Sequence, residues 1–388
     1  MLQLIQLFLQ QTWQVTFACA AQKSTNSISL KALGVKEEII VLNSSTFDEF
    51  ITGISPTIVV FDRFLTEEQF GWRVAENCPN ALRILDSEDL HFLRKVRHQQ
   101  YKKEEEFTIE ALLASDDTKR EIASILRCDL TLIISTFEME LLTNVFKIDN
   151  NLLYYLPFLL NEITSKTINN WVDFEKREHF VFIGNYHHKP NINAVITLKN
   201  HIWESIKKQL PNAELHIYGA YVNQQIKQLH NDKEGFLIKG FIKDANEVIS
   251  HSKIMLAPLN FGAGIKGKLT DAMCLGTPSI TTIIGAEGMH KNLPWNGFVT
   301  NDFKEFSNKA VTLYTSKKHW LAAQKNGVEI INTVYNINKL SVPFIDTISA
   351  TITSLKKHRL QNFFGSMLQL QTLQSTKFMS KWIEEKNK

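Results

Sequence analysis

The sequence predicts an α/β fold with two domains, each built on a parallel sheet that helices cover. From about residue 179 onward, strand-like and helix-like segments alternate with short connections, which is typical of such a sheet. The first half repeats this alternation less regularly. With 388 residues, 44% of them hydrophobic and 21% charged, the chain has the size and composition of a globular protein with two ordinary domains.

Apolar runs bounded by turn residues mark the expected strands. In the first half they are residues 14–20, 38–42, 57–62, 81–86 and 130–135, and in the second half residues 179–184, 213–219, 235–241, 253–259 and 278–284. Residues 190–210 begin with Pro190 and place apolar side chains at nearly helical spacing, which predicts a helix that covers the second sheet. A further helix is expected from about residue 266 to 276.

A polar segment without periodicity, residues 161–178, separates the two halves, and we expect the hinge there. This division gives an N-terminal domain of residues 1–165 and a C-terminal domain of residues 175–350. The tail, residues 355–388, is rich in Gln and Lys and has helical propensity. We expect its helices to pack back on the first domain.

The start of the chain predicts an incomplete first sheet. Residues 1–20 are typical of a helix that leads directly into a strand, with Leu2, Ile5 and Leu9 on one helix face. In a doubly wound sheet the first strand is central, so its loss would leave the strands at 14–20 and 57–62 apart or newly paired. The expectation is therefore that this chain is a fragment or a truncated reading frame.

Charge and composition narrow the class of partner. The formal net charge is only +3, from 43 basic and 40 acidic residues, which gives a nucleic-acid partner no support. The four cysteines form no C-x-x-C pair, and the neighbours His187 and His188 lack further ligands at metal spacing, so no metal site is expected. The longest apolar stretch, residues 152–160, is too short to span a bilayer, and a cytoplasmic location is expected.

Residues 261–278, FGAGIKGKLTDAMCLGTP, fit two nucleotide-binding patterns. Gly262, Gly264 and Gly267 match the dinucleotide fingerprint G-x-G-x-x-G, and Gly262 with Gly267 and Lys268 matches a phosphate-binding loop that lacks its final Ser or Thr. The fingerprint belongs to the first strand-to-helix turn of a domain, whereas here it would be the fourth. Glu287 keeps the dinucleotide interpretation open, because it lies near the expected place of a ribose-binding acid.

Lys266 and Lys268 stand at the expected start of a helix, where the positive end of the helix dipole disfavours cations. Two lysines in this position indicate a bound polyanion. The alternative is that both lysines point to solvent and that the glycines only make a tight turn.

The segments FIGNYHHKPNINAV, LPNAELHIYG and IKGFIKDANEVISHSKIMLAPLNFGAGIKGKLTDAMCLGTPSITTIIGAEGM together resemble the C-terminal domain of the group 1 retaining glycosyltransferases, glycosyltransferase family 4. The likeness is specific from about residue 180 to 290. It implies a GT-B fold, in which two Rossmann-like domains face each other across a cleft and the second domain holds most of a nucleotide-sugar donor. It also implies retention of configuration and no required metal or other cofactor.

The sequence departs from the family at one carboxylate. Family members commonly carry a Glu, seven residues, and then a second Glu; the first place here is Ala263 and the second is Asp271. A related form of the motif has Gly-x-Arg-x-Lys before the final Glu. Gly264, Lys266, Lys268 and Asp271 match that form, with Lys in place of Arg.

The resemblance implies a role for each of these donor-site residues. Lys266, Lys268 and the amides near Gly264 and Gly267 would stabilise the charge that develops on the leaving nucleoside diphosphate. Asp271 would accept hydrogen bonds from ribose hydroxyls, and an ion pair with Lys268 three residues earlier is the alternative.

Further positions complete the expected donor site. The turn at residues 240–244, which includes Phe241, would lie against the base. Gly184 ends the first strand of the domain, and Lys189 follows it as a candidate for phosphate contacts. Glu287 is counted with the donor-binding residues.

The acceptor is expected to approach from the first domain. Asp62 stands where many family members have a His that faces the donor sugar. Asp62, Glu88, Asp89 and His91 are candidates for orienting the acceptor hydroxyl or taking its proton, and we choose Asp62, Asp89 and His91 among them. The alternatives are capping of the next helix by Asp86, Glu88 and Asp89, and an ion pair between Asp62 and Arg63.

The sequence therefore predicts a glycosyltransferase that moves a hexose or similar sugar to an unidentified acceptor. The expected acceptor is a glycan, a lipid-linked sugar or a small molecule. A lipid-linked acceptor would bring the protein into peripheral contact with the inner face of the membrane. Two other interpretations stay open. One is an NAD-linked Rossmann oxidoreductase, and the other is a non-catalytic relative that binds a nucleotide, because Ala263 and Asp62 replace two expected groups.

Overall fold

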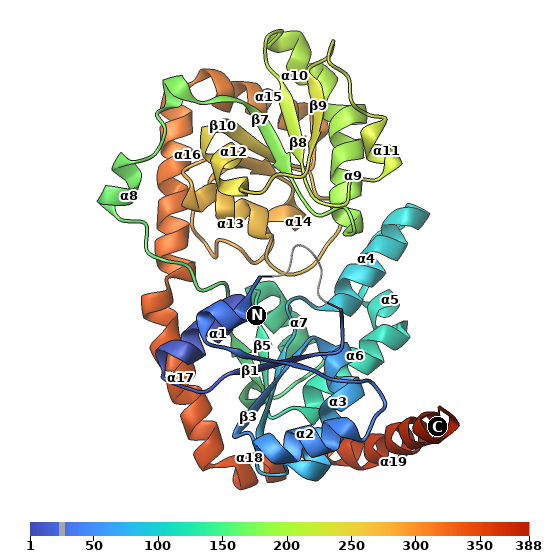
Figure 1. Ribbon diagram of the computed structural model, residues 1–388. Coiled ribbons are helices and arrows are strands. Elements are labelled where there is room, and N and C mark those ends of the chain that lie inside the picture. Colours follow the sequence, from blue (N-terminus) through green and yellow to red (C-terminus); the bar gives the residue numbers. More distant parts are fainter. Residues whose placement is uncertain (23–27, 388) are drawn as a thin grey trace.

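The structure, a computed structural model, describes residues 1–22 and 28–387. Figure 1 shows two lobes, one above the other, and each is built on a parallel sheet flanked by helices. The predicted α/β fold class with two such sheets is therefore confirmed.

The N-terminal lobe contains a four-stranded parallel sheet in the order β3-β4-β5-β6. Its strands are β3 (Ile58–Asp62), β4 (Leu82–Asp86), β5 (Leu130–Ile133) and β6 (Leu153–Tyr155). The helices of this part of the chain are α1 (Leu2–Gln10), α2 (Thr46–Ile54), α3 (Phe64–Asn77), α4 (His91–Lys103), α5 (Ile109–Ala114), α6 (Asp116–Arg127) and α7 (Thr136–Asn144). Successive side chains face opposite sides of the sheet: Leu85 packs with residues of α3 and α4, and Ile84 packs with residues of α1.

The C-terminal lobe contains a six-stranded parallel sheet in the order β12-β11-β10-β7-β8-β9. Its strands are β7 (Glu178–Ile183), β8 (Leu215–Tyr218), β9 (Phe236–Gly240), β10 (Ser252–Ala257), β11 (Ser279–Thr281) and β12 (Gly297–Val299). Its helices are α9 (Lys189–Thr197), α10 (Trp203–Gln209), α11 (Gln224–Lys227), α12 (Ala245–His251), α13 (Gly267–Cys274), α14 (Ile283–Ala286), α15 (Phe303–Thr315) and α16 (Lys317–Ile330). Along β7, Phe180 and Phe182 enter one core and Val181 enters the core on the other face, so helices cover both sides.

All ten predicted strands overlap strands of the structure, and β6 and β12 are additional. Each of the additional strands has three residues, which is too short for an alternating pattern to be visible. The predicted helix over residues 190–210 is present but contains a π-helical turn at Leu198–Ile202 between α9 and α10. No helix among the described residues is long and apolar enough to cross a membrane.

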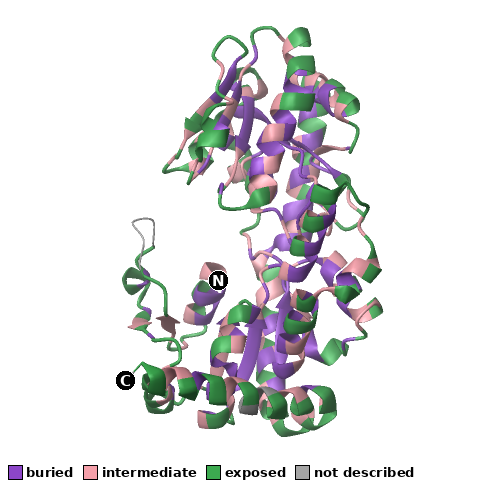
Figure 2. Cartoon of the chain, turned by 90° about the vertical axis from the view of Figure 1, so that its right-hand side faces the viewer, coloured by how far each residue is buried: buried purple, intermediate pink, exposed green. Residues whose placement is uncertain are grey.

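The strands near the N-terminus form a sheet of their own. β1 (Thr16–Cys19) pairs only with β2 (Lys36–Ile39), in parallel, and within the described residues β3 pairs on one side only, with β4. In Figure 2 these two strands lie at the left, below the grey trace and beside the main sheet. The strands predicted at 14–20 and 57–62 are thus not joined in one sheet, and the missing first strand stays a prediction.

The C-terminal part of the chain returns to the N-terminal lobe. The segment that connects the two lobes contains α8 (Ser165–Asn169). After the C-terminal lobe, α17 (Ile337–Thr353) places Phe344 and Ile348 in the core of the N-terminal lobe beside Leu82. α18 (Leu355–Gln361) follows, and α19 (Phe363–Lys386) contacts α3 and α6. Figure 2 shows α19 at the bottom, largely exposed along its outer side. The domain limits at 165, 175 and 350 stay proposals.

Candidate active site

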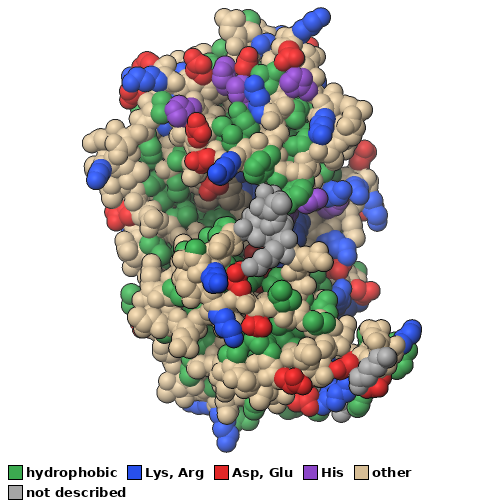
Figure 3. Space-filling view, viewed as in Figure 1, with side chains coloured by type: hydrophobic (Ala, Val, Ile, Leu, Met, Phe, Trp, Pro, Cys, Tyr) green, Lys and Arg blue, Asp and Glu red, His purple; other side chains and the backbone are tan. Residues whose placement is uncertain are grey.

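A cavity of about 500 Å³ lies between the lobes. Figure 3 shows the face on which the molecular surface is hollowed between them. The polar and charged residues that line the cavity come from both lobes: Gln3, Asp86, Glu88, Asp89 and Arg94 from the first, and His188, Asn191, Lys266 and Lys268 from the second. Its walls are completed by apolar side chains, among them Leu132, Ile134, Leu156 and Phe158.

Two helices begin at the C-terminal wall of this cavity. α9 starts after His188 and α13 starts after Lys266, and residues of both first turns line the cavity. Free backbone N–H groups and the positive end of the helix dipole make such a terminus a binding site for anions. The C-terminal wall is therefore suited to a phosphate group.

Lys268 is the cation between these two helix starts. Its Nζ donates a hydrogen bond to Asn191 Oδ1 at 2.6 Å and lies 4.1 Å from the centre of the Phe182 ring. Burial lowers the pKa of Lys268 to about 7, and no carboxylate of the described chain pairs with it. A buried amine without a counter-charge is expected to gain free energy when an anion binds beside it.

Lys266 is buried at the same end of the cavity but has partners within the protein. Its Nζ donates to the backbone oxygen of Gly264 at 2.7 Å, and burial lowers its pKa to about 8 against the attraction of Glu287 and Glu138. Neither lysine points freely into solvent, so that alternative is wrong. Lys268, in contrast, has no carboxylate of the described chain near its amine.

Gly264 brings the two lobes together. Its φ of 63° is left-handed, and a Cβ on this residue would lie 2.7 Å from Asp89 Cβ, so only glycine fits. Its N–H donates to Glu138 Oε1 at 2.9 Å, which means that this amide is not free for a phosphate in the structure. Glu138 is fully buried, and burial raises its pKa to about 8.

Arg97 of α4 holds the same loop from the N-terminal lobe. It donates two hydrogen bonds to Glu287, at 2.7 and 2.8 Å, and one to the backbone oxygen of Gly262 at 2.9 Å. Both oxygens of Glu287 are therefore engaged by Arg97, and Glu287 does not line the cavity. Glu287 was predicted to contact the donor, but in the structure its carboxylate binds Arg97 of the other lobe.

The N-terminal wall is acidic. Asp86, Glu88 and Asp89 line it, and burial raises the pKa of Asp86 to about 6. The first amides of α4 are bonded by other carboxylates: Glu121 accepts from His91 and Phe92, and Glu138 accepts from Leu90. The alternative in which the three acidic residues cap α4 is therefore wrong. Glu88 instead pairs with Arg63 at 2.7 Å, and Asp89 pairs with Arg94 at 3.0 Å.

A comparison with protein families shows which family the lobe with this C-terminal wall resembles. The family model described as "Glycosyl transferases group 1" matches residues 177–316, a range that includes the whole C-terminal wall with both helix starts. The C-terminal lobe thus matches the group 1 glycosyltransferases. No curated protein sequence matches the chain, and the family match leaves the oxidoreductase interpretation without support.

Several solved structures share the fold of this chain. HepE of Anabaena, in complex with UDP and glucose, has a TM-score of 0.65 and 10% identity, with 89% of this chain and 95% of that chain covered. Sucrose-phosphate synthase of Thermosynechococcus elongatus has a TM-score of 0.66 and 14% identity, covering 90% and 91%. TarM of S. aureus, with fondaparinux, alpha-GlcNAc-glycerol and UDP, has a TM-score of 0.60 and 13% identity, covering 78% and 58%. This chain thus spans under three fifths of the length of TarM. The similarity to HepE and sucrose-phosphate synthase over both lobes confirms the predicted GT-B fold.

The remaining predicted acceptor-side residues lie outside the cavity lining. His91 packs edge-on against Phe64, with its Nδ1 3.0 Å from the backbone oxygen of Asp89. Burial alone would lower the pKa of His91, but the neighbouring carboxylates raise it, which disfavours a neutral base. Asp62 Oδ1 lies 3.6 Å from Arg63 Nε, so the predicted alternative of a local ion pair is present.

The remaining donor-side residues differ in their positions. Gly184 lies under Asn191, because a Cβ at 184 would be 2.7 Å from Asn191 Cγ. Phe241 is exposed just after β9, and Asp271 is exposed on α13 without an ion pair to Lys268. Neither Phe241 nor Asp271 lines the cavity.

Sequence reasoning missed four residues of the site: Arg94, Arg97, Glu138 and Asn191. Arg94 and Arg97 look like the solvated side of an ordinary helix, and Glu138 looks like an ordinary first-turn acid. Asn191 lies within the segment FIGNYHHKPNINAV, in which only the two histidines were considered as metal ligands. The signal that could have identified Asn191 is its place in the first turn of the helix that follows Gly184 at the end of β7.

Proposed function

We propose that the chain transfers a sugar from a UDP-sugar to an acceptor hydroxyl, with retention of configuration and without a metal ion. The observation that carries the proposal is Lys268, a buried amine without a counter-charge between two helix starts at the cavity. A diphosphate supplies the missing negative charge. Departure of that diphosphate is then stabilised by groups that are already in place.

The chemistry divides between the two walls. On the C-terminal wall, Lys268 and the first amides of α13 bind the diphosphate, the positive end of the α9 dipole faces it, and Lys266 shapes the loop and adds positive charge. Asp271 and Phe241 are proposed for the ribose and the base, as the family resemblance implies. On the N-terminal wall, Asp89 orients the acceptor hydroxyl, while Asp62 and His91 support this wall from outside the cavity.

The choice of uridine is supported by relatives of the same fold. TarM and HepE are both solved as complexes with UDP. The acceptor is left as a hydroxyl compound, because carboxylates such as those of Asp86 and Asp89 bind the hydroxyls of a glycan, a lipid-linked sugar or a small polyol equally well.

The test is release of UDP from a panel of UDP-sugars offered with mixed acceptors. The expected result is UDP release that depends on both substrates. Binding of UDP without any turnover would instead identify a non-catalytic nucleotide-binding relative, and preferential binding of NAD would overturn the assignment.

Chelation should leave the transfer intact. Because cationic side chains and helix starts hold the diphosphate, activity after treatment with EDTA is expected to match the untreated enzyme within experimental error. An activity assay before and after chelation measures this. Loss of activity that Mg²⁺ or Mn²⁺ restores would contradict the proposed charge arrangement.

Binding of UDP should take up protons near pH 8. The pKa of Lys268 is about 7 and that of Lys266 about 8 because of burial, and a neighbouring diphosphate raises both. At pH 8 the diphosphate itself is already ionised, so uptake comes from the protein. Calorimetry in two buffers of different ionisation enthalpy should report this uptake, and Lys268→Met should reduce it. Identical enthalpies in both buffers would contradict the assignment.

A further inference from the structure

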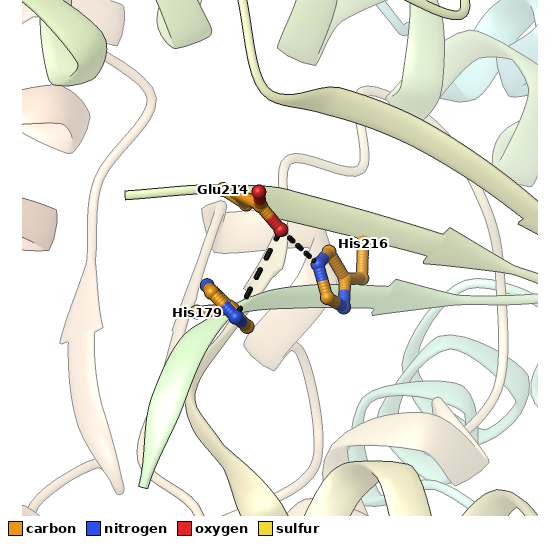
Figure 4. A group of neighbouring side chains, drawn as sticks. All are labelled: His179, Glu214 and His216. Carbon is orange, nitrogen blue, oxygen red and sulfur yellow. Dashed lines mark hydrogen bonds and ion pairs between the residues drawn. The ribbon is translucent and has the colours of Figure 1, made fainter. Parts of the chain in front are cut away.

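We propose that His179, Glu214 and His216 bind a divalent transition-metal ion, with Zn²⁺ as the best fit. The three side chains lie together in Figure 4. They stand at the amino-terminal starts of β7 and β8, whereas the cavity lies beyond the carboxyl ends of the strands, and none of them lines it. The site is therefore separate from the proposed transfer reaction.

The sequence brings these three groups together through local backbone geometry. Glu214 and His216 are two residues apart at the start of β8, so their side chains lie on the same face of the sheet. His179 is the second residue of β7, and its φ of 58° takes it out of the extended conformation. Figure 4 shows its ring turned toward Glu214.

The distances suit one small ion. His216 Nε2 lies 2.7 Å and His179 Nε2 lies 3.8 Å from the same oxygen, Glu214 Oε2, and one ligand atom from each residue lies within 4.8 Å of the others. Tetrahedral Zn²⁺ with bonds of about 2.0–2.2 Å to nitrogen and oxygen places its ligand atoms about 3.3 Å apart. The observed separations of 2.7 and 3.8 Å lie on either side of that spacing.

Neither ring nitrogen of His179 forms a hydrogen bond with the described residues, so its Nε2 is available to bind an ion. Its Nδ1 is buried without a hydrogen bond among the described residues, and its Nε2 faces two carboxylates, Glu178 at 3.6 Å and Glu214 at 3.8 Å, which are too distant for hydrogen bonds. A metal ion at Nε2 joins this ring to Glu214 and His216. Glu178 is well exposed and can supply the fourth ligand, or water can do so.

A bound ion would link the starts of two neighbouring strands of the C-terminal sheet. Because it binds the folded arrangement only, it should stabilise this lobe by an amount that grows with the logarithm of its concentration above the Kd. Two histidines and a carboxylate favour Zn²⁺ over Mg²⁺ and Ca²⁺, which prefer oxygen ligands.

The experiment is calorimetric titration of Zn²⁺ into the full chain after EDTA treatment and desalting, with Co²⁺ as a spectroscopic probe. One site is expected, together with the visible absorption of tetrahedral Co²⁺. His179→Gln, His216→Gln and Glu214→Gln should each weaken Zn²⁺ binding at least about tenfold, since each removes one of three protein ligands.

The matched control is His230→Gln. His230 Nε2 also lies 3.3 Å from a carboxylate, that of Asp232, but it belongs to no three-ligand group of the described chain. This variant should bind Zn²⁺ as the natural chain does. Thermal unfolding in EDTA establishes that each variant folds, and three separate ligand variants keep the test usable if one does not.

Two results would overturn the proposal. One is the absence of a Zn²⁺ site in the natural chain at neutral pH. The other is unchanged affinity in all three ligand variants. Neither result depends on UDP binding or on sugar transfer.

Discussion

The variant Lys268→Ala should bind UDP roughly tenfold to a hundredfold more weakly than the natural chain, because a hydrogen bond to a charged group contributes about 1.5–3 kcal/mol. The lysine stands between the starts of α9 and α13 with only Asn191 and the Phe182 ring beside its amine. Alanine removes the charge and leaves both helix starts in place. Calorimetric titration with UDP measures the difference.

Lys189→Ala is the matched control. Lys189 lies in the first turn of α9, close in sequence to Asn191, but it is exposed and does not line the cavity. The structure does not bear out its predicted role in phosphate contacts, so its loss should change UDP affinity by less than about twofold, because its exposed side-chain charge is screened by solvent. Equal affinity for UDP in the Lys268→Ala variant and the natural chain would exclude Lys268 as the diphosphate ligand.

The variant Arg97→Met should lower the free energy of unfolding by about 3–5 kcal/mol, because it leaves the carboxylate of Glu287 buried without its partner. Arg97 is 6% exposed and Glu287 15% exposed. Methionine still fills the space between the rings of Phe107 and Phe137, so the loss reports the charge and its hydrogen bonds. Urea unfolding followed by tryptophan fluorescence measures it.

Arg120→Met provides the comparison for this variant. Arg120 is 49% exposed and bonds Glu68 on the surface, a pair that should contribute less than about 1 kcal/mol. If both variants lose the same small amount, the contact between Arg97 and Glu287 does not hold the lobes together. A larger loss for Arg97→Met, with reduced sugar transfer, is the expected outcome.

The strands were the most predictable part of the fold. Runs such as residues 253–259 and 81–86 are apolar on both faces and end at turn residues, and this pattern reflects burial between two layers of helices. The separate pairing of β1 with β2 was not predictable, because pairing depends on which strand lies alongside in space. Nothing in the four residues of β1 distinguishes one neighbour from another.

The site was predictable on one wall only. The loop with Lys266 and Lys268 carries its chemistry within a few consecutive residues, and both lysines line the cavity as expected. The contact of Arg97 with Glu287 joins residues 190 positions apart, and the hydrogen bond from Gly264 to Glu138 joins residues 126 apart. Such pairs come from the approach of two lobes, which a single sequence does not encode locally.

The return of α17 to α19 onto the N-terminal lobe sets an order for folding during synthesis. Phe344 and Ile348 complete a core with Leu82, and Arg359 bonds Asp129, a residue 230 positions earlier. The cores on both faces of the C-terminal sheet, in contrast, are formed by buried residues between Ile163 and Tyr335. The second lobe can therefore finish folding while the first, although made earlier, still lacks part of its core. The first lobe would need a chaperone's protection for longest, against the usual order in which the N-terminal domain folds first.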